Sequence, residues 1–277
     1  MTLIADSGST KTHWCLMKKG AAIQHFYTKG INPFYQTSDE VGAEIDLHLM
    51  PEIKHFDVST IYFYGAGCSF PEKKAVVADA LRQRFQDASI DVQSDLLAAA
   101  RSLFQHSEGI ACILGTGSNS CYYNGVEIAA NVSPLGFILG DEGSGAVLVK
   151  AFVADCLKNQ VPSALKEKFL QQYELTPALI LEKVYKQPFP NRFLASLTPF
   201  LLENKNEPSI YKLVMSGFDA FFQRNVMGYT LNNLKVSFVG SMAYYFADIL
   251  KISAIKNGIE LGKIVQSPMD GLLNYHS

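Results

Sequence analysis

The sequence predicts an α/β fold built from two lobes, and three observations lead to this prediction. Strand-like and helix-like segments alternate over the first hundred residues. The chain opens with an apolar segment, a loop of small residues and a second alternating segment at residues 3–17. The same order of strand, loop and strand returns at 110–123. We therefore expect one lobe over residues 1–109 and another over 110–277, whose last segment can pack back on the first lobe.

The expected elements of the first lobe follow from periodicity and from turn residues. Ser38 can cap a helix, because its hydroxyl can accept a backbone N–H of the first turn. The Gly30–Pro33 segment is predicted to be a loop, since glycine and a residue before proline both disfavour helix. The predicted strands are 3–6, 13–17, 21–29, 60–64 and 90–93. The predicted helices are 38–50, 71–85 and 95–104, the last of them preceded by Ser94.

The second lobe repeats the alternation and then becomes mainly helical. Asn124-Gly125 is a strong hairpin-turn signal. The predicted strands are 110–114, 120–123, 126–129, 236–239 and 263–266. Helices are expected at 146–157, at several positions between the prolines of 160–210, at 210–234 and at 242–257, and a polar tail is expected to follow.

Composition narrows the class of protein. The 277 residues are 48% hydrophobic and 18% charged, which is typical of a globular chain with a core. A net charge of -2 offers no electrostatic basis for binding nucleic acid or a membrane surface. The apolar segments are shorter than a membrane span, and no secretory signal is visible. Five scattered cysteines without a CxxC pair indicate a reducing, cytoplasmic compartment.

The first loop that could bind a ligand follows Asp6, at residues 7–12. Small residues expose backbone N–H groups that suit phosphates, and the carboxylate suits the accompanying metal ion. An ordinary hairpin turn uses the same residue types, so the segment alone favours the plain interpretation. A Walker A loop is excluded, because the Gly-x4-Gly-Lys-Ser/Thr pattern does not occur around Lys11.

Two further glycine-rich segments support the interpretation of the first loop as a phosphate-binding loop. Residues 115–119, Gly-Thr-Gly-Ser-Asn, form a second loop of the same character. Residues 140–145 place Asp141 and Glu142 between glycines at a predicted helix start. These two carboxylates could complement the positive end of the helix, or one of them could bind a metal–nucleotide or substrate hydroxyls. Together, the three segments indicate a nucleotide held between two lobes.

Asp95 has two interpretations that the spacing alone leaves even. It follows a predicted strand and begins an apolar helix, so it could be a plain N-cap residue. It could also be a general base at a strand end beside the cleft.

Taken together, these motifs resemble those of the actin/Hsp70/sugar-kinase superfamily. Residues 6–12 resemble its first phosphate motif, residues 115–119 its second, and residues 239–241 its adenosine motif. The Gly-Asp-Glu-Gly-Ser segment at 140–144 is similar to that of the N-acetylglucosamine kinase and BadF/BadG/BcrA/BcrD ATPase group. The resemblance covers nearly the whole chain in order. It implies two ribonuclease H-like, or actin-like ATPase, lobes with a nucleotide cleft between them.

The resemblance also implies roles for single residues. Asp6 would hold Mg²⁺ and Asp95 would take the proton from the sugar hydroxyl. The ATP-binding residues would be Ser7, Gly8, Ser9, Thr10, Lys11, Gly115, Thr116, Gly117, Gly240 and Ser241. The residues near the sugar would be Asn32, Asn119, Gly136 and Asp141.

Two departures from the family pattern concern binding rather than chemistry. The adenosine motif usually has paired glycines, whereas this chain has Ser241 in the second position. Leu135-Gly136 stands where N-acetylglucosamine kinases often carry an aromatic residue beside glycine, which weakens the case for N-acetylglucosamine itself.

The resemblance leads to two functional hypotheses. The first is a Mg-ATP-dependent kinase that converts a sugar, N-acetylglucosamine or glucosamine, to the 6-phosphate, with a homodimer expected from the family. The second is an ATPase that energises a partner enzyme, as the dehydratase and reductase activators of this group do. Those activators hold an iron–sulfur cluster with cysteines. The dispersed cysteines disfavour the second hypothesis, and a sensor without turnover is disfavoured by the presence of Asp6, Asp95 and Asp141.

Overall fold

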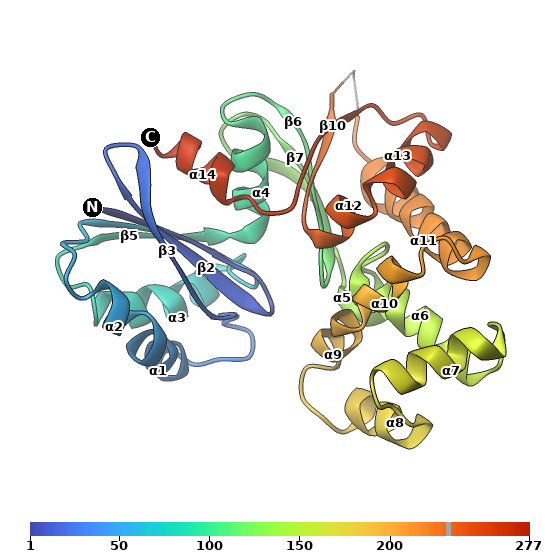
Figure 1. The fold of residues 1–277 in the computed structure, drawn as a ribbon. Helices are drawn as coiled ribbons and strands as arrows, with labels where there is room; N and C mark the ends of the chain where they lie inside the picture. Colours follow the sequence, from blue (N-terminus) through green and yellow to red (C-terminus); the bar gives the residue numbers. More distant parts are fainter. Residues whose placement is uncertain (231–233) are drawn as a thin grey trace. The chain divides into compact units, whose positions relative to one another are not determined.

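Two compact units make up the protein, in a computed structural model that describes residues 1–230 and 234–277 (Figure 1). Unit 1 contains Met1–Gly109, Tyr123–Ala129 and Ser267–Ser277, and unit 2 contains Ile110–Tyr122 and Ala130–Gln266. The chain forms two five-stranded sheets with helices packed around them. The predicted α/β fold class with two lobes is therefore confirmed.

The sheet of unit 1 has the strand order β3-β2-β1-β4-β5. β1 pairs antiparallel with β2 and parallel with β4, which in turn pairs parallel with β5. The registers place Ser7 opposite Gly65 and Gly65 opposite Ser94, so three strands end at one edge. The strands are β1 Thr2–Ser7, β2 Lys11–Lys18, β3 Ala21–Lys29, β4 Thr60–Gly65 and β5 Ser89–Ser94.

Helices cover both faces of this sheet, because its inner strands carry apolar residues on each side. Leu3 and Ala5 face a core that includes Ile45 of α1 and Val77 of α3, whereas Ile4 packs with residues of α4 and α14. Figure 1 shows these two groups of helices on opposite faces. The helices are α1 Ser38–His48, α2 Met50–Ile53, α3 Pro71–Arg82, α4 Asp95–Phe104 and α14 Met269–Tyr275.

Two predictions in unit 1 are wrong in instructive ways. Thr37, rather than Ser38, caps α1, because its hydroxyl accepts the N–H of Glu40 while the Glu40 carboxylate accepts the N–H of Thr37. The polar tail expected at the C-terminus is a helix, α14. Met269 and Leu272 of α14 are buried, and it packs against α4.

The second sheet has the order β10-β9-β6-β7-β8. β9 pairs parallel with β6 and with β10, so these strands also end at one edge. The strands are β6 Gly109–Leu114, β7 Ser118–Tyr123, β8 Ile128–Val132, β9 Val236–Val239 and β10 Leu261–Val265. β8 begins later than the predicted strand at 126–129, because the Asn124 side chain accepts the N–H groups of Val126 and Glu127 and keeps them in the turn.

Most of the helices belong to unit 2. They pack into a core that includes Cys112 of β6 and Phe238 of β9. The prolines at 177, 190 and 208 stand at the first position of a helix, where a missing N–H is harmless. The helices are α5 Gly136–Leu139, α6 Gly145–Leu157, α7 Ser163–Gln172, α8 Pro177–Tyr185, α9 Pro190–Ser196, α10 Thr198–Glu203, α11 Pro208–Phe221, the π-helix η1 Phe222–Val226, α12 Ser241–Tyr245 and α13 Ala247–Lys256.

Two long helices predicted in unit 2 differ from the observed ones. The helix expected over 210–234 ends with η1 at Val226, two residues before Gly228, and residues 231–233 of that prediction lie outside the described residues. The helix expected over 242–257 is interrupted at Phe246, whose side chain is buried in the core and whose backbone leaves the helical region. In the described parts of the chain, no helix is both long and apolar enough to cross a membrane.

Candidate functional site

Asp6 and Asp95 lie at the edge of the unit 1 sheet where β1, β4 and β5 end. Asp6 is the second-last residue of β1, and Asp95 directly follows β5. Burial, followed by the negative charge of Asp95, raises the pKa of Asp6 to about 7, while Lys11 acts in the opposite direction. The fold therefore brings two carboxylates together with a cationic side chain at this edge.

Asp95 does not act as the N-cap of α4. Ser94 holds that position, and its hydroxyl accepts the N–H of Leu97 at 3.2 Å. Asp95 is the first residue of the helix, half-buried, and its carboxylate accepts its own N–H and that of Leu96. Burial nevertheless raises the pKa of Asp95 to about 6. The N-cap interpretation is thus wrong, and the carboxylate remains available for chemistry.

The first loop joins β1 to β2 as a tight hairpin. The N–H of Gly8 donates to the carbonyl of Lys11 at 3.0 Å. Gly8, Thr10 and Lys11 are exposed, and Ser9 is partly exposed. The Lys11 ammonium lies 5.3 Å from the centre of the Tyr27 ring. The hairpin geometry fits both interpretations of the loop, and its exposed backbone is open to a ligand.

Ser7 differs from the rest of this loop, because its side chain is buried and engaged within the protein. Its hydroxyl lies 2.7 Å from that of Thr12, donates to the carbonyl of Ile31 at 3.0 Å and accepts the N–H of Ile31. These bonds tie the first loop to the loop that carries Asn32. Sequence inspection missed this connection, since nothing local to Ser7 indicates a partner at Ile31.

Asn32 is held in an Asx turn beside the loop that follows β4. Its side-chain oxygen accepts the N–H of Phe34 at 3.0 Å. A Cβ on Gly67 would meet that oxygen at 2.4 Å, so the close approach requires glycine there. Gly30 is equally constrained, since its Cβ would meet the backbone of Gly8 and Ser9. Asn32 thus has a fixed orientation near the first loop.

The second loop, Gly115–Gly117, follows β6 in unit 2 and contacts the start of α6. The N–H of Gly145 donates to the carbonyl of Gly115 at 2.8 Å, and that of Ala146 donates to Thr116 at 3.2 Å. A Cβ on Gly115 would meet no atom within 4 Å. The loop is therefore anchored through its carbonyls on one side and open on the other.

Gly240 and Ser241 follow β9 beside the second loop. Gly240 has φ +125°, and a Cβ there would lie 2.2 Å from the carbonyl oxygen of Leu114. Both facts require glycine. Ser241 is exposed at the start of α12. The three predicted ATP-binding segments of the chain thus follow the ends of β1, β6 and β9.

Asp141 lies against the second loop. A Cβ on Gly117 would sit 2.9 Å from its Oδ2, and the N–H of Ser118 donates to its carboxylate. Burial, with a smaller contribution from the charge of Glu142, raises the pKa of Asp141 to about 6, while the Ser118 hydrogen bond and Lys150 act in the opposite direction. The helix that follows is capped by Ser144, so Asp141 is not needed for that task.

Asn119 and Gly136 complete the predicted residues of unit 2. The side-chain oxygen of Asn119 accepts the N–H of Ser120 and the amide of Asn131, at 2.9 and 3.0 Å. Gly136 has φ +73° and open space where a Cβ would be. The predicted residues therefore form two groups. Asp6, Ser7–Lys11, Asn32 and Asp95 belong to unit 1, and the others to unit 2.

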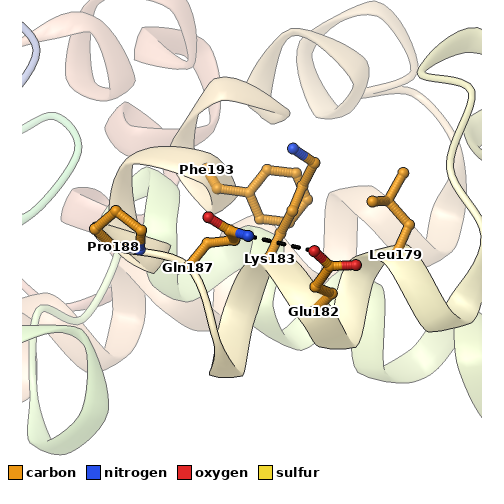
Figure 2. Close-up of a pocket in the computed structure, with 6 residues that line it drawn as sticks. All are labelled: Leu179, Glu182, Lys183, Gln187, Pro188 and Phe193. Atoms are coloured by element: carbon orange, nitrogen blue, oxygen red, sulfur yellow. Dashed lines mark hydrogen bonds between the residues drawn. The ribbon is translucent and has the colours of Figure 1, made fainter.

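A separate surface hollow is lined by residues of α8, of the segment that follows it and of α9. Figure 2 shows the six residues that line it, which are Leu179, Glu182, Lys183, Gln187, Pro188 and Phe193. The Gln187 amide donates to Glu182 at 3.3 Å, and the Lys183 ammonium lies 5.5 Å from the centre of the Phe193 ring. None of the residues predicted to bind nucleotide or sugar lines this hollow.

The five cysteines bear on the choice between a kinase and a cluster-bearing ATPase. All five are buried with free thiols. Burial raises the pKa of each, for example that of Cys68 to about 12. Within the described residues, no group of three His, Cys, Asp or Glu side chains could hold a metal ion. Buried thiols with raised pKa values are poor ligands for an iron–sulfur cluster, even though Cys112 and Cys121 lie close enough to interact.

Comparison with known proteins places these observations in a family. No family model matches the chain. A crystal structure from Porphyromonas gingivalis, named "putative N-acetylglucosamine kinase", is 49% identical, with a TM-score of 0.97 over 100% of this chain and 98% of that one. The N-acetylmuramic acid/N-acetylglucosamine kinase of Clostridium acetobutylicum is 27% identical over 205 residues, 70% of this chain and 67% of that protein.

A more distant structure shows the fold alone. A Chromobacterium violaceum protein, also named "putative N-acetylglucosamine kinase", is 14% identical with a TM-score of 0.67, covering 100% of this chain and 98% of that one. The identity to the Porphyromonas gingivalis protein is high and extends over the full length of both chains. This chain therefore belongs to the same family as that protein, a family of sugar kinases with the actin-like ATPase fold.

Proposed function

We propose that this protein is an ATP-dependent kinase that phosphorylates an amino sugar, N-acetylglucosamine or glucosamine, at the 6-hydroxyl. One observation carries the proposal. Asp95 is a half-buried carboxylate at the sheet edge, is not used as a helix cap, and has a pKa raised to about 6. A base with this pKa is unprotonated at neutral pH and still basic enough to accept a proton in the transition state.

In the proposed reaction, Asp95 accepts the proton of the attacking sugar hydroxyl. The sugar oxygen forms a bond to the γ-phosphorus of ATP as the bond from that phosphorus to the β–γ bridging oxygen breaks. ADP leaves with the negative charge. Little covalent chemistry falls to the protein, so most of its contribution is positioning and charge stabilisation.

The donor set at Asp6 fits a divalent cation. Mg²⁺ is usually bound through one or two carboxylates together with waters and substrate phosphates. Asp6 and Asp95 repel each other, and this repulsion adds to the rise in the pKa of Asp6. A cation held by Asp6 would relieve that repulsion and supply positive charge beside the phosphates. Asp6 is therefore assigned to the metal and Asp95 to the proton.

The loops supply the remaining contacts in this proposal. Backbone N–H groups of Gly8–Lys11 and Gly115–Gly117 would bind the phosphates, and Gly240 and Ser241 would lie against adenosine. Ser7 would contribute through its backbone, because its hydroxyl is bonded to Thr12 and Ile31. Asn32, Asn119, Gly136 and Asp141 would contact the sugar. The lobes would be residues 1–109 and 110–277, with the last segment belonging structurally to the first.

Membership of the BadF/BadG/BcrA/BcrD group, a homodimer and a cytoplasmic location also belong to this proposal. The first rests on the sequence motifs, the second on the family resemblance and the third on the five scattered cysteines. The alternative, an ATPase that energises a partner enzyme, is less well supported, because each of the five thiols is buried.

The test is turnover with Mg-ATP and a panel of sugars. Asp95→Asn should abolish sugar phosphorylation and leave ATP affinity nearly unchanged, since it removes the base and keeps the shape of the side chain. Asp39→Asn, an exposed residue of α1, is the control. Rapid ATP hydrolysis with the same rate for every sugar would favour the partner-driving ATPase, and wild-type turnover in Asp95→Asn would refute the assignment of the base.

A further inference from the structure

The backbone of Asp141 lies in the left-handed region, which is less favourable than the right-handed one for residues with a Cβ, although aspartate adopts it more readily than most. Its φ is +54°. The N–H of Asp141 donates to the carbonyl of Pro134 at 3.0 Å, and its carbonyl accepts the N–H of Ser144 at 3.1 Å. This conformation directs the carboxylate at Gly117 and the N–H of Ser118. Contacts from neighbouring residues must therefore stabilise this left-handed conformation.

Glu142, the next residue, is fixed by two partners from a distant part of the chain. The Arg224 guanidinium lies 2.7 Å from Oε1, and the Asn225 amide donates to Oε2 at 3.0 Å. The Glu142 side chain is 14% exposed and that of Arg224 is 65% exposed. Both carboxylate oxygens of Glu142 are therefore engaged, and of the two neighbouring acids Asp141 is the one left to meet a ligand.

The two partners come from the π-helix η1. Its hydrogen bond runs from the N–H of Met227 to the carbonyl of Phe222 at 2.9 Å, one residue further than in an α-helix. Asn225 is itself buried, and its carbonyl accepts the hydroxyl of Ser120 of β7 at 2.6 Å. The connection thus runs from the Ser120 hydroxyl of β7 through the main-chain carbonyl and side-chain amide of Asn225 to Glu142, all within unit 2.

We infer that Glu142 is a positioning residue for the acceptor sugar, because its bonds to Arg224 and Asn225 hold the 140–143 loop and so keep Asp141 against the second loop. This inference rests on the proposed function, since it assigns Asp141 to the sugar. A buried carboxylate with charge-assisted bonds is a strong anchor, and its removal leaves the buried Asn225 amide without that acceptor. The loop would then relax from its left-handed conformation.

The test compares steady-state kinetics of full-length variants with Mg-ATP and the best hexosamine. Glu142→Ala should raise KM for the sugar at least tenfold, change kcat less than threefold and leave KM for ATP within twofold. Glu142→Gln keeps one acceptor oxygen and should restore most of the sugar affinity. Arg224→Ala should raise KM for the sugar by less than Glu142→Ala does, because Asn225 still holds the loop. The double variant Glu142→Ala/Arg224→Ala should have nearly the same sugar KM as Glu142→Ala alone.

A matched control removes another ion pair of unit 2. Lys205 Nζ and Asp248 Oδ2 are 2.6 Å apart, with Lys205 partly exposed and Asp248 exposed, and Asp248→Ala should leave both KM values at the wild-type level. Thermal melting of each variant reports folding. A wild-type sugar KM in Glu142→Ala, or equal losses in kcat and both KM values, would overturn the inference. Failure of the wild-type protein to phosphorylate any hexosamine would instead overturn the proposed function.

Discussion

Replacing Asp6 by asparagine should stabilise the protein at pH 8 in the absence of divalent cations. Burial, followed by the charge of Asp95, raises the pKa of Asp6 from 3.8 to about 7. The folded state therefore binds this proton more tightly than the unfolded state. Between these two pKa values the folded protein carries more protons, so the free energy of unfolding falls as pH rises. Asparagine removes the charge that causes this loss.

The magnitude follows from the size of the shift. Raising a pKa by about 3 units corresponds to about 4 kcal/mol at a pH above both values, as an upper bound. Asp6 is partly exposed, and solvent screening reduces this to about 1–2 kcal/mol. For a chain of this size, such a gain raises the melting temperature by roughly 2–8 °C. A residue placed at the metal position is thus expected to destabilise the metal-free protein.

The assay is thermal melting of wild type and Asp6→Asn in EDTA at pH 5 and pH 8. The gain should be largest at pH 8 and clearly smaller at pH 5, where folded Asp6 is protonated while unfolded Asp6 is already ionised, and it should vanish only below the unfolded pKa of 3.8. Mg-ATP should favour the wild type. Asp248→Asn is the control of opposite sign: burial alone would raise the pKa of Asp248, but the hydrogen bond and charge of Lys205 lower it. Equal melting temperatures of Asp6→Asn and wild type at pH 8 would refute the argument from charge burial.

Two further predictions concern the base and the adenosine segment. The value of kcat/KM for sugar should fall below an apparent pKa of about 6, about tenfold per pH unit, because protonated Asp95 cannot accept the hydroxyl proton; a flat profile from pH 5 to 8 would contradict this. Gly240→Ala should lower the melting temperature and raise KM for ATP, since its Cβ would lie 2.2 Å from the carbonyl of Leu114. Gly258 is also at positive φ, but a Cβ there would meet no atom within 4 Å, so Gly258→Ala should lower the melting temperature less and leave KM for ATP unchanged. Equal effects of Gly240→Ala and Gly258→Ala would count against the steric argument.

Local signals were sufficient where a few neighbouring residues decide the structure. The strand over Ala21–Lys29 is observed with the predicted bounds, and the small-residue loops follow strands as expected. The capping box of Thr37 and Glu40 is also a local feature, because it involves residues three apart, but the cap was predicted at Ser38. The identity of the cap was missed by one position, as the adjacent Ser38 is an equally suitable residue type.

Predictions failed where a distant surface decides the outcome. The tail at 267–277 carries Met269 and Leu272, which favour a helix there only because α4 provides the surface that buries them. The helix expected over 242–257 breaks at Phe246, whose burial in the unit 2 core outweighs an uninterrupted helical pattern. Packing overrides local propensity in both cases.

The candidate site also contains features that local sequence predicts and features that only distant contacts decide. Asp6, Asp95 and the glycine loops could be proposed as site residues from the sequence, because their residue types suit phosphate binding and proton transfer and the family resemblance assigns their roles. Whether Asp95 caps α4 could not be read from the sequence, since Ser94 and Asp95 both suit that position; the Ser94 hydrogen bond decides it. The partners of Glu142 were also hidden, since Asn225 lies 83 residues away. Backbone conformation and small-residue loops depend on neighbours in the chain, whereas pKa shifts, buried ion pairs and loop anchoring depend on contacts that only the folded sheet and helices create.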